Sequence, residues 1–430
     1  MKTLFTIGFV AIAWIALCQT LPVGNPKRME ERILALGRFG TNPEGGVSRV
    51  AYSEADKAGR AYVMGLMKNA GLEVRLDFAG NIIGRRKGQD NNLPPIAFGS
   101  HIDSVPGGGN YDGDVGSLGA IECIDLLNDA KITTQHPLEV IIFQNEEGGL
   151  IGSEAVCGIL PEKSLDLVSN SGKTIRQGII ELGGDPAKLS EAIRTKGFYH
   201  AFLELHIEQG GILDRTGINI GVVEGIVGIN QWEVTIKGKA NHAGTTPMDQ
   251  RQDAMVAAAK LTLAANQTAL RTPGRQVATV GRISAEPGAP NVIPGKVVMT
   301  LEIRDLSHEK VIAVFQTIQA NGKEIEKETG TTIDYKLTNE NMPAPTNKFI
   351  QEQVAASAKD LALSSMVMPS GAGHDSQDMA TIAPTGMVFV PSKKGVSHAP
   401  DEFTSPQDMA NGASVLLRTI LKLDKVKTLN

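Results

Sequence analysis

Most of this chain alternates between two patterns of apolar residues, one typical of helices and the other typical of buried strands. Apolar residues about three or four positions apart predict helices, whereas short, nearly continuous apolar runs predict strands that are buried on both faces. In the first half of the chain the expected helices cover 31–39, 53–70 and 116–130, and the expected strands cover 73–77, 81–85, 96–100, 138–144 and 201–206. Helices placed between buried strands indicate an α/β sheet with helices on both faces.

A second unit with a different order of elements interrupts this pattern from about Gly228 to Tyr335. Its expected elements are a strand at 231–237, a helix at 251–267, strands at 276–283 and 296–304, a helix at 310–327 and a strand at 332–337. This order, β-α-β-β-α-β, is the split ferredoxin-like motif. Because 430 residues exceed one ordinary core, we expect an α/β main domain with a mixed sheet, covering 27–212 and 336–430, interrupted by a ferredoxin-like domain that covers 213–335.

The first residues of the chain have a different character. An apolar run over 4–17 follows Lys2 and precedes Cys18; it is too short for a comfortable membrane span and has the shape of a secretory signal peptide. We therefore expect residues 1–20 to be removed during export, leaving a periplasmic or secreted protein with no stable membrane association. An uncleaved apolar anchor is one alternative. A lipid on Cys18 is another, although the bulky Leu17 before the cysteine counts against it.

Composition narrows the class of protein. The chain is 41% hydrophobic and 21% charged, which is typical of a soluble globular protein. Its net charge of −5 offers no basic stripe, so nucleic acid is not an expected partner. Apart from Cys18 the only cysteines are Cys123 and Cys157, so no disulfide framework holds the fold together, even in an exported protein.

Five residues of the types that bind metal ions stand out along the chain. They are His101 and Asp112 in GSHIDSVPGGGNYDGDVG, Glu147 in FQNEEGG, His206 in LELHIEQGG and His398 in GVSHAPDE. Imidazoles and carboxylates without a thiolate suit two zinc-like ions. A pair of such ions, about 3.5–4 Å apart, makes hydroxide at neutral pH and clamps a tetrahedral intermediate. The residue types thus indicate a dinuclear hydrolytic centre.

The expected positions of these residues support the same conclusion. His101, Glu147 and His206 lie at or just past the ends of expected strands, where open α/β sheets place ligands. The glycine-rich loop at 107–109 can bend to bring Asp112 beside His101. Each residue alone has a simpler explanation, namely a solvated turn, an exposed acidic loop or a satisfied buried histidine. Only the combination, in this order, predicts a metal site.

Two further carboxylates lie next to these candidate ligands. Asp103 follows His101 by two residues and could accept the second ring N–H of that histidine, fixing its tautomer. Glu146 precedes Glu147 at the end of an apolar strand. Adjacent side chains there can point in different directions, so Glu147 can bind metal while Glu146 stays free as a general base.

Several of these stretches together carry a resemblance to a known family. The most specific are HIEQG, HAGTTPM and GAGHD, and NEEGG, PNVIPG, EIRD and GVSHAPDE also match. From roughly Arg28 to Arg418 the sequence resembles the M20 dinuclear zinc amidohydrolases. Within them it is most similar to the subgroup of N-carbamoyl-L-amino-acid hydrolases, allantoate amidohydrolases and β-ureidopropionases.

The resemblance implies two divalent metal ions per chain, with zinc favoured and manganese, cobalt and nickel as alternatives that share these ligands. One ion would be held by His101, Asp112 and His206, and the other by Asp112, Glu147 and His398. Glu146 would act as the general base, and Asp103 would orient His101.

The resemblance also implies a role for the inserted domain as a lid and dimerisation domain that reaches the active site of a partner in a homodimer. His242, Asn291 and Arg304 match substrate-contacting positions. Arg304 would clamp a substrate carboxylate, for which a guanidinium fork is well shaped. Gln209 and the glycine-rich loop that contains Gly373 and His374 would line the pocket.

The implied activity is metal-dependent hydrolysis of a non-peptide C–N bond. The favoured substrate is a carbamoyl (ureido) small molecule with a carboxylate, namely an N-carbamoyl-L-amino acid, hydrolysed to the amino acid, carbon dioxide and ammonia. Allantoate is the nearest alternative, and a broader aminoacylase or dipeptidase is the next. A catalytically silent binding protein with the same fold is an alternative of another class; the presence of all five ligands and Glu146 counts against it.

Overall fold

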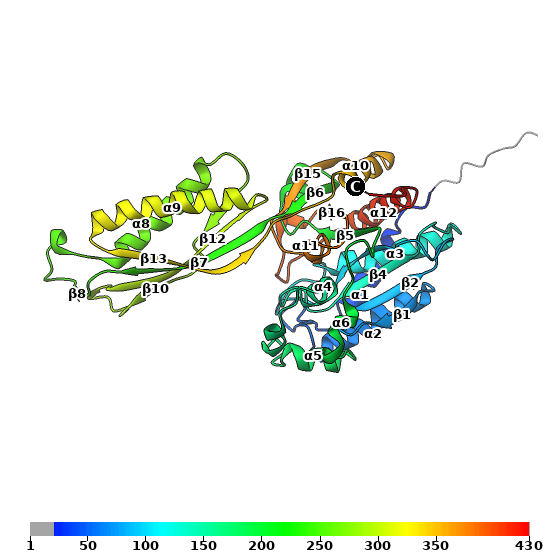
Figure 1. The fold of residues 1–430 in the computed structure, drawn as a ribbon, viewed down its shortest axis with the longest axis horizontal. Coiled ribbons are helices and arrows are strands. Elements are labelled where there is room, and N and C mark those ends of the chain that lie inside the picture. Colours follow the sequence, from blue (N-terminus) through cyan, green and yellow to red (C-terminus); the bar gives the residue numbers. More distant parts are fainter. Residues whose placement is uncertain (1–20, 430) are drawn as a thin grey trace, which may run out of the picture.

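A computed structural model describes residues 21–429 of the chain, so the predicted signal peptide at 1–20 lies outside the described residues. Figure 1 shows a rounded main domain and a second unit that projects from it as a long arm. We call residues 228–341 the arm, from the first residue of its first strand to the last residue of its last strand. Among the helices of residues 21–429, none has the length and apolar content needed to cross a membrane.

The main domain is built on one mixed sheet, as predicted. The strand order is β1-β2-β4-β3-β5-β16-β6-β14, and β15 also pairs with β6. The strands are β1 (Glu73–Leu76), β2 (Ile82–Arg86), β3 (Ile96–His101), β4 (Leu138–Phe143), β5 (Ala201–Ile207), β6 (Ile220–Ile226), β14 (Ala344–Pro345), β15 (Ser365–Ser370) and β16 (Thr385–Val390). Strands β3, β4, β5 and β16 are parallel neighbours and buried at every position. Burial on both faces explains their continuous apolar runs.

Helices cover both faces of this sheet (Figure 1). Those of the main domain are α1 (Pro26–Leu36), α2 (Glu54–Asn69), α3 (Asp114–Asp129), α4 (Ile151–Cys157), α5 (Ile175–Glu181), α6 (Leu189–Ala192), α7 (Ile212–Thr216), α10 (Lys348–Asp360), α11 (Asp375–Met379) and α12 (Pro406–Leu423). Alternate residues of β3 face opposite sides: Phe98 packs in a core with α1, α2, α3, α10 and α12, and Ala97 packs in a core with α4 and α11. The predicted layering is confirmed.

The arm has the predicted ferredoxin-like topology. Its elements are β7 (Gly228–Lys237), β8 (Asn241–His242), α8 (Ala254–Arg271), β9 (Val277–Thr279), β10 (Ile283–Glu286), β11 (Val292–Ile293), β12 (Lys296–Asp305), α9 (His308–Thr329) and β13 (Thr332–Asn341). The antiparallel sheet has the order β10-β12-β7-β13, and β9 also pairs with β12. Helices α8 and α9 pack on one face of this sheet, so the other face is open. Strands β8 and β11 form a small ribbon.

Some boundaries differ from the predicted ones. Strand β6 pairs with β15 and β16 in the main sheet, so the arm begins at Gly228, after the predicted boundary at 213, and β13 extends it past 335. The single strand predicted at 276–283 is wrong: β9 and β10 are separate strands that pair with different parts of β12. The first helix begins at Pro26, where the side chain of Asn25 caps it, a start signal that apolar spacing does not reveal.

Candidate active site

The ends of the central strands bring the predicted ligands together. His101 is the last residue of β3, His206 is near the end of β5, and Glu147 follows β4. Because β4, β3 and β5 are parallel neighbours, their carboxyl ends meet at one edge of the sheet. Asp112 precedes α3, and His398 lies in the loop between β16 and α12.

Asp112 is the centre of this cluster, and its two oxygens face different groups. His206 Nε2 lies 3.0 Å from Asp112 Oδ1, and His101 Nε2 lies 3.9 Å from the same oxygen. On the other side, His398 Nε2 lies 3.1 Å from Asp112 Oδ2 and 3.4 Å from Glu147 Oε1. Two groups of three possible ligands therefore share Asp112, and within each group the ligand atoms lie within 4.8 Å of one another.

Backbone carbonyls orient the two buried imidazoles of the first group. His101 Nδ1 lies 3.0 Å from the Asp103 carbonyl oxygen, and His206 Nδ1 lies 2.9 Å from the Ile207 carbonyl oxygen. Since a carbonyl can only accept, each Nδ1 carries the proton. Both Nε2 atoms, which face Asp112, are therefore the ones available to a metal ion.

Asp103 differs from its predicted role in how it acts. Its carboxylate is 3.7 Å from His101 Nδ1, and its backbone oxygen accepts the ring proton instead. The carboxylate accepts the backbone N–H groups of Glu146 at 3.1 Å and Glu147 at 3.2 Å. Asp103 thus orients His101 through its main chain, while its side chain holds the turn that carries both glutamates.

Glu146 lies beside the cluster without belonging to either ligand group. Its Oε2 is 3.8 Å from His101 Nε2. Burial, together with the nearby carboxylates of Asp375 and Glu147, raises the pKa of Glu146 well above its ordinary range. A carboxyl group with a raised pKa beside metal ligands is well suited to hold and release a proton.

The charges and donors of the cluster fit divalent cations. Burial would raise the pKa of Asp112, but the imidazoles of His206, His398 and His101 hold it well below its usual range. Burial lowers the pKa of His206, yet Asp112 raises it to about 9, while hydrogen bonds to Asp112 and Glu147 raise that of His398 to about 10. Glu147 Oε1 is buried and lies 3.4 Å from His398 Nε2. Cations would pair with these carboxylates and displace the histidine protons.

Glu402, which the sequence reasoning missed, joins the two loops that carry Asp112 and His398. Its Oε1 accepts the backbone N–H groups of Tyr111 at 2.8 Å and Asp112 at 3.0 Å. Its Oε2 accepts the backbone N–H of His398 at 3.2 Å. A Cβ at Gly109 would collide with the Glu402 side chain, so that glycine permits the contact. The position of Glu402 at the end of GVSHAPDE was the only signal in the sequence.

The backbone around the cluster takes unusual conformations. Asn145, Gln209 and His398 have φ values of 52°, 56° and 55°, in the left-handed region that non-glycine residues seldom adopt. Gly113 has φ 66°, and a Cβ there would collide with the ring of His101. Gln209 Nε2 donates to Asp112 Oδ2 at 2.7 Å, which places this predicted pocket residue in direct contact with the shared carboxylate.

A third group of possible ligands, Glu204, His206 and His374, overlaps the first. Glu204 already accepts hydrogen bonds from Ser100 Oγ at 2.7 Å and from Ser376 N and Oγ at 3.1 and 2.7 Å, so it acts as a buried acceptor between elements. His374, next to Gly373, is only 1% exposed and packs edge-on against His206, with ring centroids 4.4 Å apart. It therefore lies behind a predicted ligand.

The three predicted site residues of the arm lie at its two ends. His242 is exposed on β8, and exposed Asn291 accepts the N–H of Ala243 at 2.9 Å. Figure 1 places β8 at the end of the arm away from the main domain. Arg304 lies at the base, where its Nη1 donates to the Gly371 carbonyl oxygen at 2.7 Å. Of these three residues, Arg304 is the one with a hydrogen bond to the main domain among residues 21–429.

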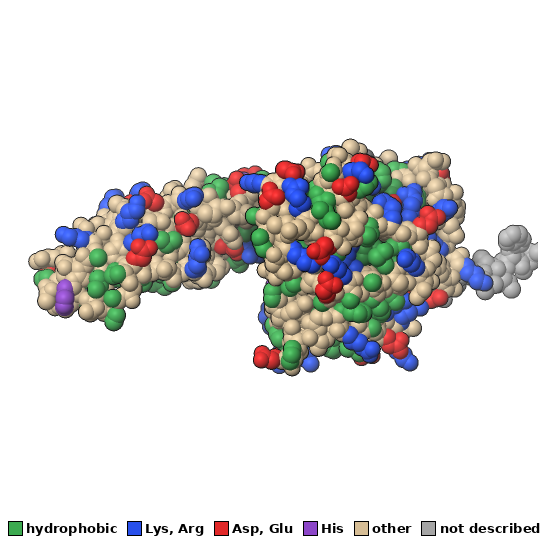
Figure 2. Space-filling view, turned by 90° about the horizontal axis from the view of Figure 1, so that it is seen from below, with side chains coloured by type: hydrophobic (Ala, Val, Ile, Leu, Met, Phe, Trp, Pro, Cys, Tyr) green, Lys and Arg blue, Asp and Glu red, His purple; other side chains and the backbone are tan. Residues whose placement is uncertain are grey.

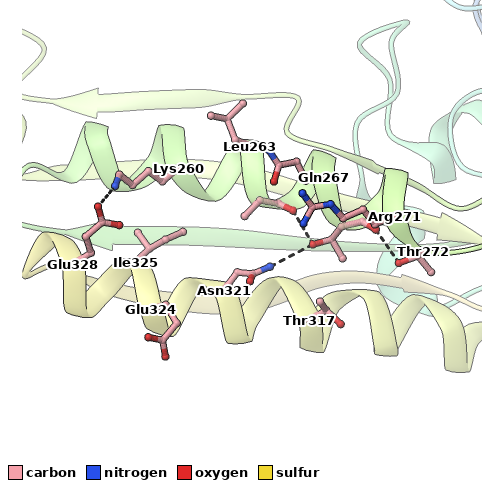
Figure 3. A pocket seen from close by; sticks show the side chains of 12 residues that line it. Lys260, Leu263, Gln267, Arg271, Thr272, Thr317, Asn321, Glu324, Ile325 and Glu328 are labelled. Carbon is pink, nitrogen blue, oxygen red and sulfur yellow. Dashed lines mark hydrogen bonds and ion pairs between the residues drawn. The ribbon is translucent and has the colours of Figure 1, made fainter.

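A groove of about 550 Å³ lies between α8 and α9. Figure 3 shows its polar lining, including an ion pair between Lys260 and Glu328 and a hydrogen bond from Asn321 to the Thr268 hydroxyl. None of the predicted site residues lines it. This groove is therefore separate from the candidate active site, which is identified by its charged groups.

Comparisons with known proteins agree with the geometry. The model of peptidase family M20/M25/M40 matches residues 97–422. An N-carbamoyl-L-amino acid amidohydrolase from Geobacillus stearothermophilus is 38% identical over 402 residues, covering 92% of this chain and 98% of that protein. A ureidoglycolate hydrolase from Arabidopsis thaliana is 39% identical over 422 residues, covering 95% of this chain and 88% of that protein. A solved amidase of the hydantoinase/carbamoylase family from Burkholderia multivorans has a TM-score of 0.87 and 34% identity, covering 93% and 98%.

Proposed function

The chain belongs to peptidase family M20/M25/M40, and from this premise we propose that it hydrolyses the ureido C–N bond of an N-carbamoyl-L-amino acid. One water is consumed, and the products are the amino acid, carbon dioxide and ammonia. The observation that carries the proposal is the pair of ligand groups that share Asp112. Allantoate is the second candidate, because relatives from Escherichia coli and Bacillus subtilis named allantoate amidohydrolase are each 34% identical to this chain.

Two divalent metal ions complete the proposed site, with zinc favoured over manganese, cobalt and nickel. His101, Asp112 and His206 would hold one ion, and Asp112, Glu147 and His398 would hold the other. When bound, such ions polarise a carbonyl group and lower the pKa of water. The buried Glu147 Oε1 and the Nε2 atoms directed at Asp112 support this assignment.

Glu146 moves the proton in the proposed reaction. Its carboxylate takes a proton from the attacking water and returns it to the leaving nitrogen of the ureido group. Asp103 supports this step by holding the backbone of Glu146 and Glu147. The carboxylate of the substrate is bound by Arg304, whose guanidinium lies next to the loop of Gly371.

A second copy of the chain supplies His242 and Asn291. Both lie at the tip of the arm, away from the cluster of their own chain (Figure 1). His242 Nδ1 accepts the N–H groups of Gly244 at 3.0 Å and Thr245 at 3.2 Å, so its outward Nε2 carries the proton. In a homodimer this N–H stabilises the negative charge that develops on the ureido oxygen.

The outer side of the arm has features of an interface for such a dimer. Leu263 and Leu270 of α8 are 61% and 77% exposed and, seven residues apart, lie on one face of the helix. Within residues 21–429 the neighbouring strands β9 and β10 pair only with β12, and they carry the exposed side chains of Val277 and Ile283. Seen from below, a separate group of apolar side chains lies towards the tip of the arm (Figure 2). An apolar helix face beside an open sheet edge suits a two-fold partner.

A substrate panel tests the proposed activity. After loading with each candidate metal, the protein is expected to release ammonia from N-carbamoyl-L-amino acids faster than from N-acetyl or N-formyl amino acids, dipeptides or allantoate. Carbamoyl amino acid amides, which lack the carboxylate, are expected to have KM values at least about tenfold higher, since a charge-assisted pair is lost. Faster release from allantoate would favour the second candidate, and no release from any compound would favour a silent binding protein.

We also propose that the protein is exported, since the run at 4–17 has the form of a signal peptide. Cell fractionation with mass analysis of the recovered chain checks this. A periplasmic or secreted chain that begins close to residues 18–20 is expected, and a full-length chain confined to the cytoplasm would contradict export.

A further inference from the structure

The open face of the arm sheet carries a charged pair at its base. Along β12 the buried residues alternate with partly exposed ones, and residues two apart share one face of a strand. Glu302 and Arg304 therefore lie side by side on the face that α8 and α9 leave open. Since Arg304 pairs with Ile229 and Asp305 with Gly228, at the start of β7, both side chains are at the end of the arm that joins the main domain.

Both carboxylate oxygens of Glu302 are used. Oε1 accepts Arg304 Nε at 2.6 Å, and Oε2 accepts the side-chain amide of Gln231 at 2.6 Å. Gln231 is directly opposite Glu302 in the pairing of β7 with β12. The amide of Gln231 thus fixes the Glu302 carboxylate, and that carboxylate in turn fixes the Arg304 guanidinium.

The remaining nitrogens of Arg304 are directed at the main domain. Nη1 donates to the Gly371 carbonyl oxygen at 2.7 Å, and Nη2 donates no hydrogen bond to another residue of 21–429. Gly371 begins the loop that leads to His374, whose ring packs on His206. The terminal edge of the guanidinium therefore lies next to a loop that contacts a proposed metal ligand.

We propose that Glu302, held by Gln231, is a positioning residue that makes Arg304 present its terminal Nη1/Nη2 edge to the substrate carboxylate. A guanidinium can bind a carboxylate through its Nε side or through its terminal edge. Glu302 occupies the Nε side, which leaves only the terminal edge and restricts rotation of the side chain. This inference rests on the proposed function, because it takes Arg304 to be the carboxylate clamp.

Glu302 could also weaken the binding of the substrate carboxylate, and the experiment has to distinguish this effect from positioning. A carboxylate beside Arg304 could compete with the substrate for the guanidinium, so that its removal would lower KM. Positioning predicts a higher KM, restricted to substrates that carry a carboxylate. The sign of the change in KM therefore distinguishes the two effects.

The experiment compares Glu302→Ala, Glu302→Gln and Arg304→Lys with an N-carbamoyl amino acid and its amide. Glu302→Ala is expected to raise KM for the acid about tenfold, the scale of one charge-assisted hydrogen bond, with little change in kcat or in KM for the amide. Glu302→Gln keeps a neutral acceptor for Nε and should recover much of the loss. Adding Glu302→Ala to Arg304→Lys should raise KM no further, since both changes act through one contact.

Asp334→Ala is the matched control. Asp334 pairs with Lys237 at 3.2 Å on the same sheet, so the variant removes a more exposed ion pair away from the base, and KM should not change. Metal content and thermal unfolding confirm that each variant folds. If Glu302→Ala does not fold, Gln231→Ala removes the other anchor and should raise KM for the acid in the same selective way.

The outcomes separate the two proposals. Suppose that Arg304→Lys raises KM but Glu302→Ala, or Gln231→Ala where that variant replaces it, leaves KM unchanged or lowers it. This result overturns the positioning role of Glu302 and leaves the clamp by Arg304 in place. An unchanged KM in Arg304→Lys overturns the clamp itself, and with it both statements about this pair.

Discussion

Replacing Glu146 with glutamine is expected to reduce kcat at least about a hundredfold, the usual scale for loss of a general base, while the protein keeps both metal ions. The amide has nearly the same shape as the carboxylate but cannot take a proton from water. Neither proposed ligand group includes Glu146, so metal content should not change. Elemental analysis of the purified variant, together with kcat on the best substrate from the panel, measures both quantities.

The neighbouring residue supplies the control for this experiment. Glu147→Gln weakens a ligand, and this variant is expected to lose the ion shared by Asp112, Glu147 and His398. If Glu146→Gln loses an ion and Glu147→Gln keeps both, the roles of the two glutamates are reversed. If both variants keep two ions and full activity, another group is the base.

The ligands could be predicted from the sequence because their positions depend on strands that are easy to identify. Strands β3, β4 and β5 are buried along their whole length, so their apolar runs are clear and their ends can be placed within a residue or two. A histidine at the end of each of two adjacent parallel strands must lie near the other. His101 and His206 needed no further information.

The contacts that orient these ligands depend on groups far apart in the sequence and could not be predicted. Glu402 reaches the backbone at Tyr111 and Asp112, nearly three hundred residues earlier in the chain. The pairing of Gln231 with Glu302 needs the register of β7 and β12. Hydrogen bonds to main-chain carbonyl groups also cannot be identified from residue types, because every residue has such a carbonyl. For this reason the carboxylate of Asp103, rather than its carbonyl, was the expected partner of His101.

The shape of the arm determines which active site the residues at its tip can reach. The ribbon formed by β8 and β11 lies at the end of the arm that is away from the main domain (Figure 1). The strands β7 and β12 pair continuously over their full lengths, so bending the arm sheet to bring its tip towards its own main domain would break that ladder. We therefore expect His242 to serve an active site that belongs to another copy.

Mixing two inactive variants is expected to restore activity if His242 acts across a homodimer. Glu146→Gln and His242→Ala homodimers should each be nearly inactive. In a mixed dimer one site carries both changes and the other carries neither. After dissociation and random reassembly of equal amounts, about half of the dimers are mixed, so about a quarter of all sites should be intact. Two different affinity tags, used in sequence, isolate the mixed dimers, and ammonia release measures their activity.

A second mixture shows whether the restored activity depends on the arm. Glu146→Gln combined with Glu147→Gln places both changes in main domains, so every site of a mixed dimer is damaged and no activity should return. Recovery only with His242→Ala indicates that the arm of one chain completes the site of the other. Mixed dimers that form but stay inactive would mean that His242 does not serve the neighbouring site, because a histidine acting within its own chain leaves every site with one lesion.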